Sequence, residues 1–293
     1  MTRNVRIIAA EVVNDARAVV GEGALWDFRS QRLMWVDIPA GEVHELDPAD
    51  GSDRVQPIGQ PVGAVGLRSG GGYVLAVRDG FAALEGGRMS MLADVELDRP
   101  DMRMNDGKVD PAGRFWAGTM ALDSRPRAGG LYRIDAGHRV ERVLGDLTIS
   151  NGMDWSDSGQ MYFIDSAAGG VDVFDFAMAD GSIAGRRRVV EIPESLGVPD
   201  GMTLDAEGLL WVAIWDGSAV RRYRPDGSLD AEVRLPVSQP TSCAFGDDDL
   251  DTLYITTARD ELSPEEAAAE PHAGAIFACR PGVQGRRADE YRG

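Results

Sequence analysis

The sequence predicts an all-β protein that folds as a six-bladed β-propeller with a metal site in its central channel. A polar turn rich in Asp and Gly, followed by a short strand with an aromatic residue, occurs six times. These aromatics are separated by 38, 43, 46, 49 and 43 positions, which matches propeller blades of four short strands. The aromatics that mark the six copies are Trp35, Tyr73, Trp116, Tyr162, Trp211 and Tyr254.

Each aromatic strand is followed by a third strand in which apolar and polar residues alternate, as expected of half-buried strands. A more variable fourth segment completes each unit. The blades are predicted to start near residues 21, 62, 104, 150, 199 and 240, so that residues 1–293 form one domain. We expect residues 6–13 to close the ring by adding the outer strand of the last blade. Residues 263–270 are the exception to the strand pattern, because Ser263 and Pro264 predict the start of a short helix.

Charge and cysteine content exclude several classes of protein. The net charge of -18 should repel nucleic acid and anionic membranes, so neither is an expected partner. Cys243 and Cys279 are too few for a disulfide framework and are expected to be buried free thiols. No apolar run reaches the roughly 18 residues that cross a membrane, and the N-terminal residues lack the apolar core of a signal peptide. We therefore expect a cytoplasmic protein. Its predicted state, a monomer or a weak homodimer, is a separate expectation.

One position of the predicted innermost strand is polar in most of the repeats. It lies four residues before the apolar residue that precedes each turn, and it is occupied by Glu22, Val62 or Gly63, Asn105, Asn151, Asp200 and Thr241. Asp and Asn beside Gly are common turn residues, and the pair formed by Asn151 and Gly152 is by itself a hairpin signal. Because several polar residues share one register of the repeat, we interpret them as a common site at the mouth of the channel.

Carboxylate and amide oxygens in this column are typical ligands of a hard divalent cation. Isolated carboxylates facing a narrow channel would also be costly without such a partner. The column has no histidine for other kinds of catalysis, because His44, His138 and His272 lie outside it. The chain also has no G-x-S-x-G elbow, phosphate-binding loop or Cys-x-x-Cys motif. Ca, Zn, Mn, Mg and Fe(II) all remain open as the metal.

Several long motifs resemble the SMP-30/gluconolactonase/LRE-like family, also called the regucalcin family. The motifs occur in the expected order between about Gly21 and about Cys279, and they read GEGALWD, RMNDGKVDPAGRFWAGTM, SNGMDW, PDGMTLDAEGLLWVA and TTAR. The resemblance implies a six-bladed propeller with one catalytic divalent metal in the channel and a gluconolactonase-type carboxylic ester hydrolase activity. It also implies that Glu22, Asn151 and Asp200 bind the metal and that Asp200 is the general acid and base.

The resemblance further implies that Arg103 and Asn105 bind the substrate. Asp123 stands where some relatives use a Glu to touch substrate, and its shorter side chain indicates a different reach and a different preferred sugar. The predicted reaction is the hydrolysis of aldonolactones, such as glucono-, xylono- or arabinono-lactone, to aldonic acids. Two alternatives stay open: a promiscuous lactonase, arylesterase or phosphotriesterase with apolar substrates, and a non-enzymatic calcium-binding propeller.

Overall fold

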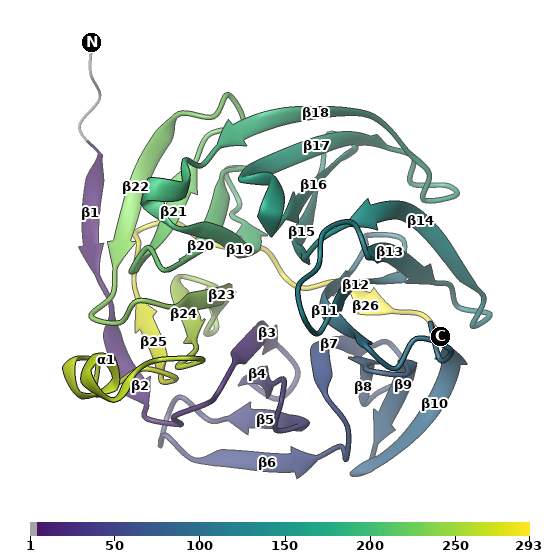
Figure 1. The fold of residues 1–293 in the computed structure, drawn as a ribbon, viewed down its shortest axis with the longest axis horizontal. Helices are drawn as coiled ribbons and strands as arrows, with labels where there is room; N and C mark the ends of the chain where they lie inside the picture. The colour runs from purple at the N-terminus through teal and green to yellow at the C-terminus, as the bar shows by residue number, and fades with distance from the viewer. Residues whose placement is uncertain (1–4) are drawn as a thin grey trace.

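The computed structural model describes residues 5–293, and it confirms an all-β fold of six sheets arranged as the blades of a propeller (Figure 1). The strands next to the channel are β3 (Gly21–Asp27), β7 (Val62–Arg68), β11 (Met102–Val109), β15 (Ser150–Ser156), β19 (Val198–Leu204) and β23 (Pro240–Gly246). The second strands are β4 (Arg32–Asp37), β8 (Tyr73–Val77), β12 (Phe115–Ala121), β16 (Gln160–Asp165), β20 (Leu210–Trp215) and β24 (Thr252–Thr257).

The third and outer strands complete each blade, and antiparallel pairing connects its four strands into one sheet. The third strands are β5 (Glu42–Leu46), β9 (Gly80–Glu85), β13 (Gly129–Ile134), β17 (Gly170–Phe176), β21 (Ala219–Tyr223) and β25 (Ile276–Cys279). The outer strands are β6 (Asp53–Pro57), β10 (Arg88–Asp94), β14 (Val140–Leu147), β18 (Ile183–Glu191), β22 (Leu229–Arg234) and, in the last blade, β2 (Glu11–Asn14). Two 3-10 turns, η1 (Ser166–Ala168) and η2 (Glu194–Leu196), follow β16 and β18.

The N-terminal segment differs from the single strand expected over residues 6–13. It forms two strands, β1 (Arg6–Ala9) and β2, which belong to different blades. β1 pairs in parallel with β22 at the edge of the fifth blade, whereas β2 pairs with β25 in the sixth. The break falls at Ala10, where the chain crosses from one sheet to the next. The segment therefore joins two neighbouring blades: β2 supplies the outer strand of the last blade, as predicted, and β1 adds a fifth strand outside β22.

The only α-helix in residues 5–293 is α1 (Pro264–Ala269), in the long connection of the sixth blade. Ser263 and Glu266 form the predicted cap reciprocally: the Ser263 hydroxyl accepts the Glu266 N–H at 3.3 Å, and the Glu266 carboxylate accepts the Ser263 N–H at 2.9 Å. No helix in the described part of the chain is both long and apolar enough to cross a membrane.

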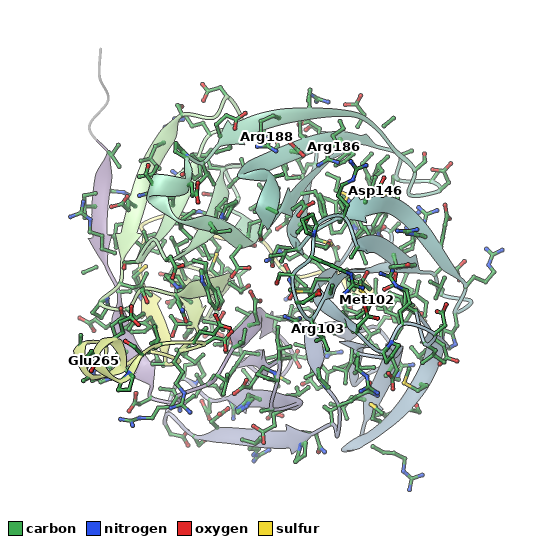
Figure 2. The ribbon with its side chains drawn as sticks, viewed as in Figure 1. Met102, Arg103, Asp146, Arg186, Arg188 and Glu265 are labelled. Atoms are coloured by element: carbon green, nitrogen blue, oxygen red, sulfur yellow. The ribbon has the colours of Figure 1, made fainter. Side chains whose placement is uncertain are left out.

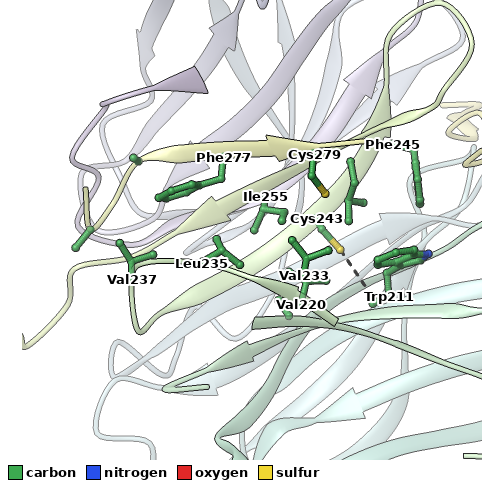
Figure 3. Close-up of a cluster of buried hydrophobic side chains, with 14 residues drawn as sticks. Trp211, Val220, Val233, Leu235, Val237, Cys243, Phe245, Ile255, Phe277 and Cys279 are labelled. Carbon is green, nitrogen blue, oxygen red and sulfur yellow. Dashed lines mark hydrogen bonds between the residues drawn. The ribbon is translucent and has the colours of Figure 1, made fainter. Parts of the chain in front are cut away.

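Apolar side chains fill the space between neighbouring blades. The cluster between the fifth and sixth blades combines Trp211, Val220 and Val233 with Cys243 and Phe277, all of them buried (Figure 3). Both cysteines are free and buried, as predicted. Burial raises the pKa of the Cys243 thiol to about 12, so this cysteine is a packing residue at neutral pH. Because each blade face is covered only by its neighbour, the ring gains its stability as a whole.

Every innermost strand has a β-bulge near its beginning. In each blade the pairing with the second strand shifts by one residue at or beside the predicted column position. A bulge leaves one residue out of the ladder and redirects the side chains around it. In the second blade the bulged residue is Gly63, where a Cβ atom would lie 2.3 Å from the Asn105 carbonyl oxygen. The second blade thus contributes no side chain to the column because β11 lies too close.

The C-terminal tail, residues 280–293, crosses the propeller at the opposite end of the channel and passes behind the centre of the ring in Figure 1. It ends in β26 (Glu290–Tyr291), which pairs in parallel with β7. The tail contacts the turn after the innermost strand in every blade, through Phe28, Ser69, Gly113, Asp157, Ala206 and Leu250. The column residues lie near the beginning of these strands and the tail lies beyond their ends, so the tail covers the other mouth of the channel.

Candidate functional site: an acidic cluster in the channel

The four column residues with a carboxylate or amide side chain are buried where β3, β11, β15 and β19 begin. The exposed fractions are 4% for Glu22, 7% for Asn105, 5% for Asn151 and 7% for Asp200. Neighbouring strands are connected directly at this level, because the Asn105 amide donates to the Ser150 carbonyl at 2.8 Å. Gly152 permits the close approach of β15 and β19, since a Cβ atom there would lie 2.7 Å from the Asp200 carbonyl oxygen. Asn151 therefore lies in a buried strand and not at a hairpin tip.

The environment of Asn151 and Glu22 leaves two buried oxygens without a hydrogen-bond partner. The Asn151 Nδ2 donates to the Ser166 hydroxyl at 3.0 Å, and its Oδ1 has no partner. One Glu22 oxygen accepts the N–H of Gly23, and the other, Oε1, is also unpartnered. A buried oxygen without a donor is unfavourable unless a cation or another donor meets it. These two atoms are therefore suitable cation ligands.

A third acidic residue, Asp106, lies beside Glu22 and Asp200. It directly follows Asn105 and is 8% exposed. Burial raises the pKa of Glu22 well above its ordinary value, and the negative charges of Asp200 and Asp106 raise it further. Burial and the charge of Asp106 likewise raise the pKa of Asp200. Burial raises the pKa of Asp106 itself to about 6. The negative charges of Asp106 and Asp200 act on Glu22, and that of Asp106 acts on Asp200; this mutual repulsion of buried carboxylates favours a bound cation.

Sequence reasoning missed Asp106, although a signal for it was present. In a regular strand, successive side chains point to opposite faces, so Asn105 and Asp106 should not both face the channel. The pairing of β11 with β12 shifts between Met104 and Gly107, which leaves Asn105 and Asp106 in the bulge. The adjacent Asn-Asp-Gly residues were the available clue, but only the shifted pairing shows which of them face the site.

The positive charge of Arg103 acts on both Glu22 and Asp200, and it opposes the rise in their pKa values. Its side chain lies toward the inner part of the ring, whereas Arg186 and Arg188 lie near the outer strands (Figure 2). Its Nη1 donates to the Asn105 Oδ1 at 2.7 Å and to the Met104 carbonyl at 3.0 Å. Burial lowers the pKa of Arg103 to about 10, which still leaves the guanidinium charged at neutral pH. Arg103 and Asn105 thus form one hydrogen-bonded unit beside the acids.

Asp123 is not part of this buried cluster. It lies in the connection after β12, where its carboxylate is 65% exposed and pairs with Arg125 at 3.0 Å. The same arginine also pairs with Asp101, directly before β11. The loop is therefore attached to the end of the blade that carries Arg103, and Asp123 lies on its exposed surface.

The donor set of the cluster fits a hard cation better than a soft one. Residues 5–293 contain no group of three or more His, Cys, Asp or Glu side chains arranged as a metal site, so a site here depends on the amide of Asn151 as well as on carboxylates. Glu22 and Asp200 would supply the charged oxygens, and Asn151 would supply a neutral one. Oxygen-only sets of this kind are typical of Ca, Mg and Mn sites.

Cation binding should become more stabilising as pH rises. Without a cation, the raised pKa values of Glu22, Asp200 and Asp106 mean that the folded protein holds protons that the unfolded chain releases near pH 4. The stabilisation that comes from holding these protons is fully present below about pH 4. It is lost as pH rises through the pKa values of the folded protein, of which that of Asp106 is about 6. A cation replaces these protons. We expect the rise in Tm on adding Mn²⁺ to chelated protein to grow from about pH 5 to about pH 8.

The control for this measurement is Asp200→Asn, which removes one of the three acids and should flatten the pH dependence. A rise in Tm that is equal at all pH values, or equal in the variant, would contradict a cation that binds these carboxylates.

Comparison with known proteins agrees with the six-bladed fold and identifies the family. The sequence profile described as "SMP-30/Gluconolactonase/LRE-like region" matches residues 20–259. Regucalcin of Homo sapiens is 40% identical over 296 residues, covering 98% of this chain and 99% of the human protein. The crystal structure of regucalcin from Agrobacterium tumefaciens, described as a calcium-binding protein, has a TM-score of 0.94 at 29% identity, covering 99% of this chain and 100% of the other.

A gluconolactonase from Xanthomonas campestris shares the fold, with a TM-score of 0.74 at 21% identity over 91% of this chain and 87% of the other. The profile match covers most of the chain, and the human relative matches almost from end to end. The protein is therefore a member of the SMP-30/gluconolactonase/LRE-like family.

Proposed function

We propose that this protein is a metal-dependent hydrolase of sugar lactones, which converts aldonolactones such as glucono-, xylono- or arabinono-lactone to aldonic acids. The observation that carries the proposal is the buried cluster of Glu22, Asn151 and Asp200 in a chain of this family, with unpartnered oxygens on Glu22 and Asn151. In this proposal these three residues hold one divalent cation. When bound, that cation supplies Lewis-acid activation of the lactone carbonyl and of water.

The residues of the chain have separate roles in the proposed reaction. Asp200 takes the proton from the attacking water and returns it to the ring oxygen as the ester bond breaks. Arg103 and Asn105 orient the hydroxyl groups of the sugar, and the Arg103 charge stabilises the negative charge that develops on the carbonyl oxygen. Their mutual hydrogen bond of 2.7 Å supports this role, because it limits the motion of both groups before substrate binds.

Asp123 is retained in the proposal as a substrate contact from the rim of the site. Its exposed carboxylate on the loop after β12 is available to a polyol, although Arg125 pairs with it in the structure. The polar character of Arg103, Asn105 and Asp123 favours a hydrophilic sugar over the apolar esters of an arylesterase. The expected cytoplasmic location and the monomeric or weakly dimeric state also remain predictions.

Removal of the metal is the direct test. We expect chelation to lower gluconolactone turnover at least about 100-fold, because metal and general acid–base assistance together exceed that factor. Readdition of Ca, Zn, Mn, Mg or Fe(II) one at a time, against a panel of aldonolactones, should restore turnover and rank both metals and sugars. Turnover that survives chelation would contradict the proposal.

The same assay separates the alternatives. Phenyl acetate turnover well above that of every aldonolactone would favour a promiscuous esterase. Tight calcium binding without turnover of any lactone or ester would favour a non-enzymatic calcium-binding propeller, in keeping with the description of the Agrobacterium relative as a calcium-binding protein.

A further inference from the structure

A second polar level lies in the channel, three residues beyond the column in each innermost strand. Three blades contribute Lys108, Asp154 and Thr203 at this level, whereas the others contribute Leu25, Gly66 and Ala244. All six residues line an internal cavity of about 70 Å³, together with Asp106 on the side of the acidic cluster and Arg286 to Asp289 of the tail. The cavity therefore extends from Asp106 to the C-terminal tail, and Glu22, Asn151 and Asp200 are not among its lining residues.

Lys108 is the only lysine among the 293 residues, and every other permanently positive side chain is an arginine. Its Nζ donates to the Asp154 Oδ2 at 3.0 Å and to the Met202 carbonyl at 3.0 Å. One ammonium group on β11 thus holds both β15 and β19. A compact ammonium suits this position, because a planar guanidinium needs a wider arrangement of acceptors.

Asp154 is the centre of the arrangement. Besides Lys108, its Oδ2 accepts the Leu204 N–H at 2.9 Å and the Thr203 hydroxyl at 3.3 Å. The lysine and arginine charges and these hydrogen bonds outweigh burial, and they hold the pKa of Asp154 below its ordinary value. Its carboxylate is 11% exposed. A buried carboxylate with this many donors joins β15 to β19 firmly.

Arg286 connects the tail to this pair from the other mouth of the channel. Its Nη2 donates to the Asp154 Oδ1 at 3.1 Å and to the Trp155 carbonyl at 2.5 Å, and its Nη1 donates to Asp157 at 3.1 Å. Arg286 is 132 positions from Asp154 in the sequence. The tail thus brings the Arg286 guanidinium to Asp154 while its backbone contacts the turns of the blades.

We propose that Lys108, Asp154 and Arg286 form a brace that holds β11, β15 and β19 at the separation that the acidic cluster needs to bind its cation. These three strands carry Asn105, Asn151 and Asp200, each three residues before the second polar level. The brace residues are positioning residues that act through the strands and do not touch the reacting atoms. The inference rests on the cation site of the proposed function, and it makes the C-terminal tail a part of that site's support.

The test uses Lys108→Met and Arg286→Met in the full chain, with Mn²⁺ as the probe. Arg221→Met is the matched control, because it breaks the Arg221–Glu232 pair of 3.0 Å, whose side chains are 11% and 13% exposed, between β21 and β22. Free Mn²⁺ is measured by electron paramagnetic resonance, Ca²⁺ is measured by competition, and Tm is measured for each variant. Support from outside the ligand shell typically contributes about 10- to 100-fold to metal affinity.

We expect Lys108→Met to weaken Mn²⁺ binding by about 10- to 100-fold, with a smaller loss in Arg286→Met and a change of less than about 2-fold in the control. Wild-type Mn²⁺ affinity in both brace variants, with a fall in Tm like that of the control, would show a purely structural ion pair and overturn the brace. If Lys108→Met does not fold, the Mn²⁺ affinity and Tm of Arg286→Met decide the question. We expect this variant to fold, because the Arg286 side chain is 27% exposed in the wild type. Failure of the wild-type protein to bind either cation would instead overturn the proposed metal site and, with it, the brace.

Discussion

Replacing Asp200 with Asn is expected to lower kcat for lactone hydrolysis by about 10²- to 10⁴-fold, the range of a lost general acid or base. The substitution keeps the size of the side chain but removes the carboxylate that is to move the proton. It also removes one of the negative charges around the cation, so we expect weaker Mn²⁺ binding. Because burial and neighbouring charges raise the pKa of Asp200 in the metal-free protein, a neutral Asn should not destabilise that form.

The matched control is Asp175→Asn, which removes an aspartate in β17 whose side chain is 68% exposed and pairs with Arg187 at 3.0 Å. Its kcat should stay within about 2-fold of wild type, as expected of an exposed surface ion pair. Saturating Mn²⁺ distinguishes lost affinity from lost chemistry, because only a catalytic defect persists there. Full turnover of Asp200→Asn at saturating metal would exclude Asp200 as the general acid and base.

Replacing Trp211 with Ala is expected to lower the free energy of unfolding by about 3–5 kcal/mol, as for other buried Trp or Phe truncations. The indole is fully buried in the cluster between the fifth and sixth blades (Figure 3). Its N–H donates to the Asp205 carboxylate at 2.9 Å, and the Arg222 guanidinium lies 5.6 Å from the ring centre. Truncation therefore leaves a cavity and also removes a donor from a buried acid.

Trp215→Ala is the control in the same strand, because Trp215 is only partly buried, and it should cost clearly less. Urea unfolding, monitored by circular dichroism, gives the free energy of unfolding of both variants. Equal slopes of this free energy against urea concentration show that the variants expose the same amount of surface on unfolding. A loss below about 1 kcal/mol for Trp211→Ala would mean that the cluster relaxes around the gap.

The repeat also explains why this position was easy to recognise in the sequence. Trp116 in the third blade has the same surroundings as Trp211, since its indole N–H donates to Asp110 at 2.8 Å and Arg133 lies 5.4 Å from its ring centre. In the third, fifth and sixth blades the aromatic donates to the Asp of the preceding turn, so the two residues recur together in the sequence. A single sequence therefore contains several copies of the same structural information, which made the fold and the register of the column predictable.

Other features depend on contacts between residues that are far apart in the sequence. The N-terminal segment pairs with two blades, although its apolar pattern indicated one strand. The tail across the far mouth was not predicted at all, because residues 280–293 have no repeat and little strand pattern of their own. Their conformation is set by backbone hydrogen bonds to turns in four blades and by side-chain hydrogen bonds to turns in the other two, which no local propensity encodes.

By itself, the sequence determined the six-bladed fold, the family, and the shared register of Glu22, Asn105, Asn151 and Asp200. Periodic patterns carry this information because side-chain direction in a strand repeats every two residues and blade packing repeats with each unit. Only the tertiary structure decided that Asp106 joins the acids and that Arg286 reaches Asp154 from the tail. The first depends on a bulge that breaks the two-residue alternation, and the second on ring closure, which brings together residues that no local pattern relates.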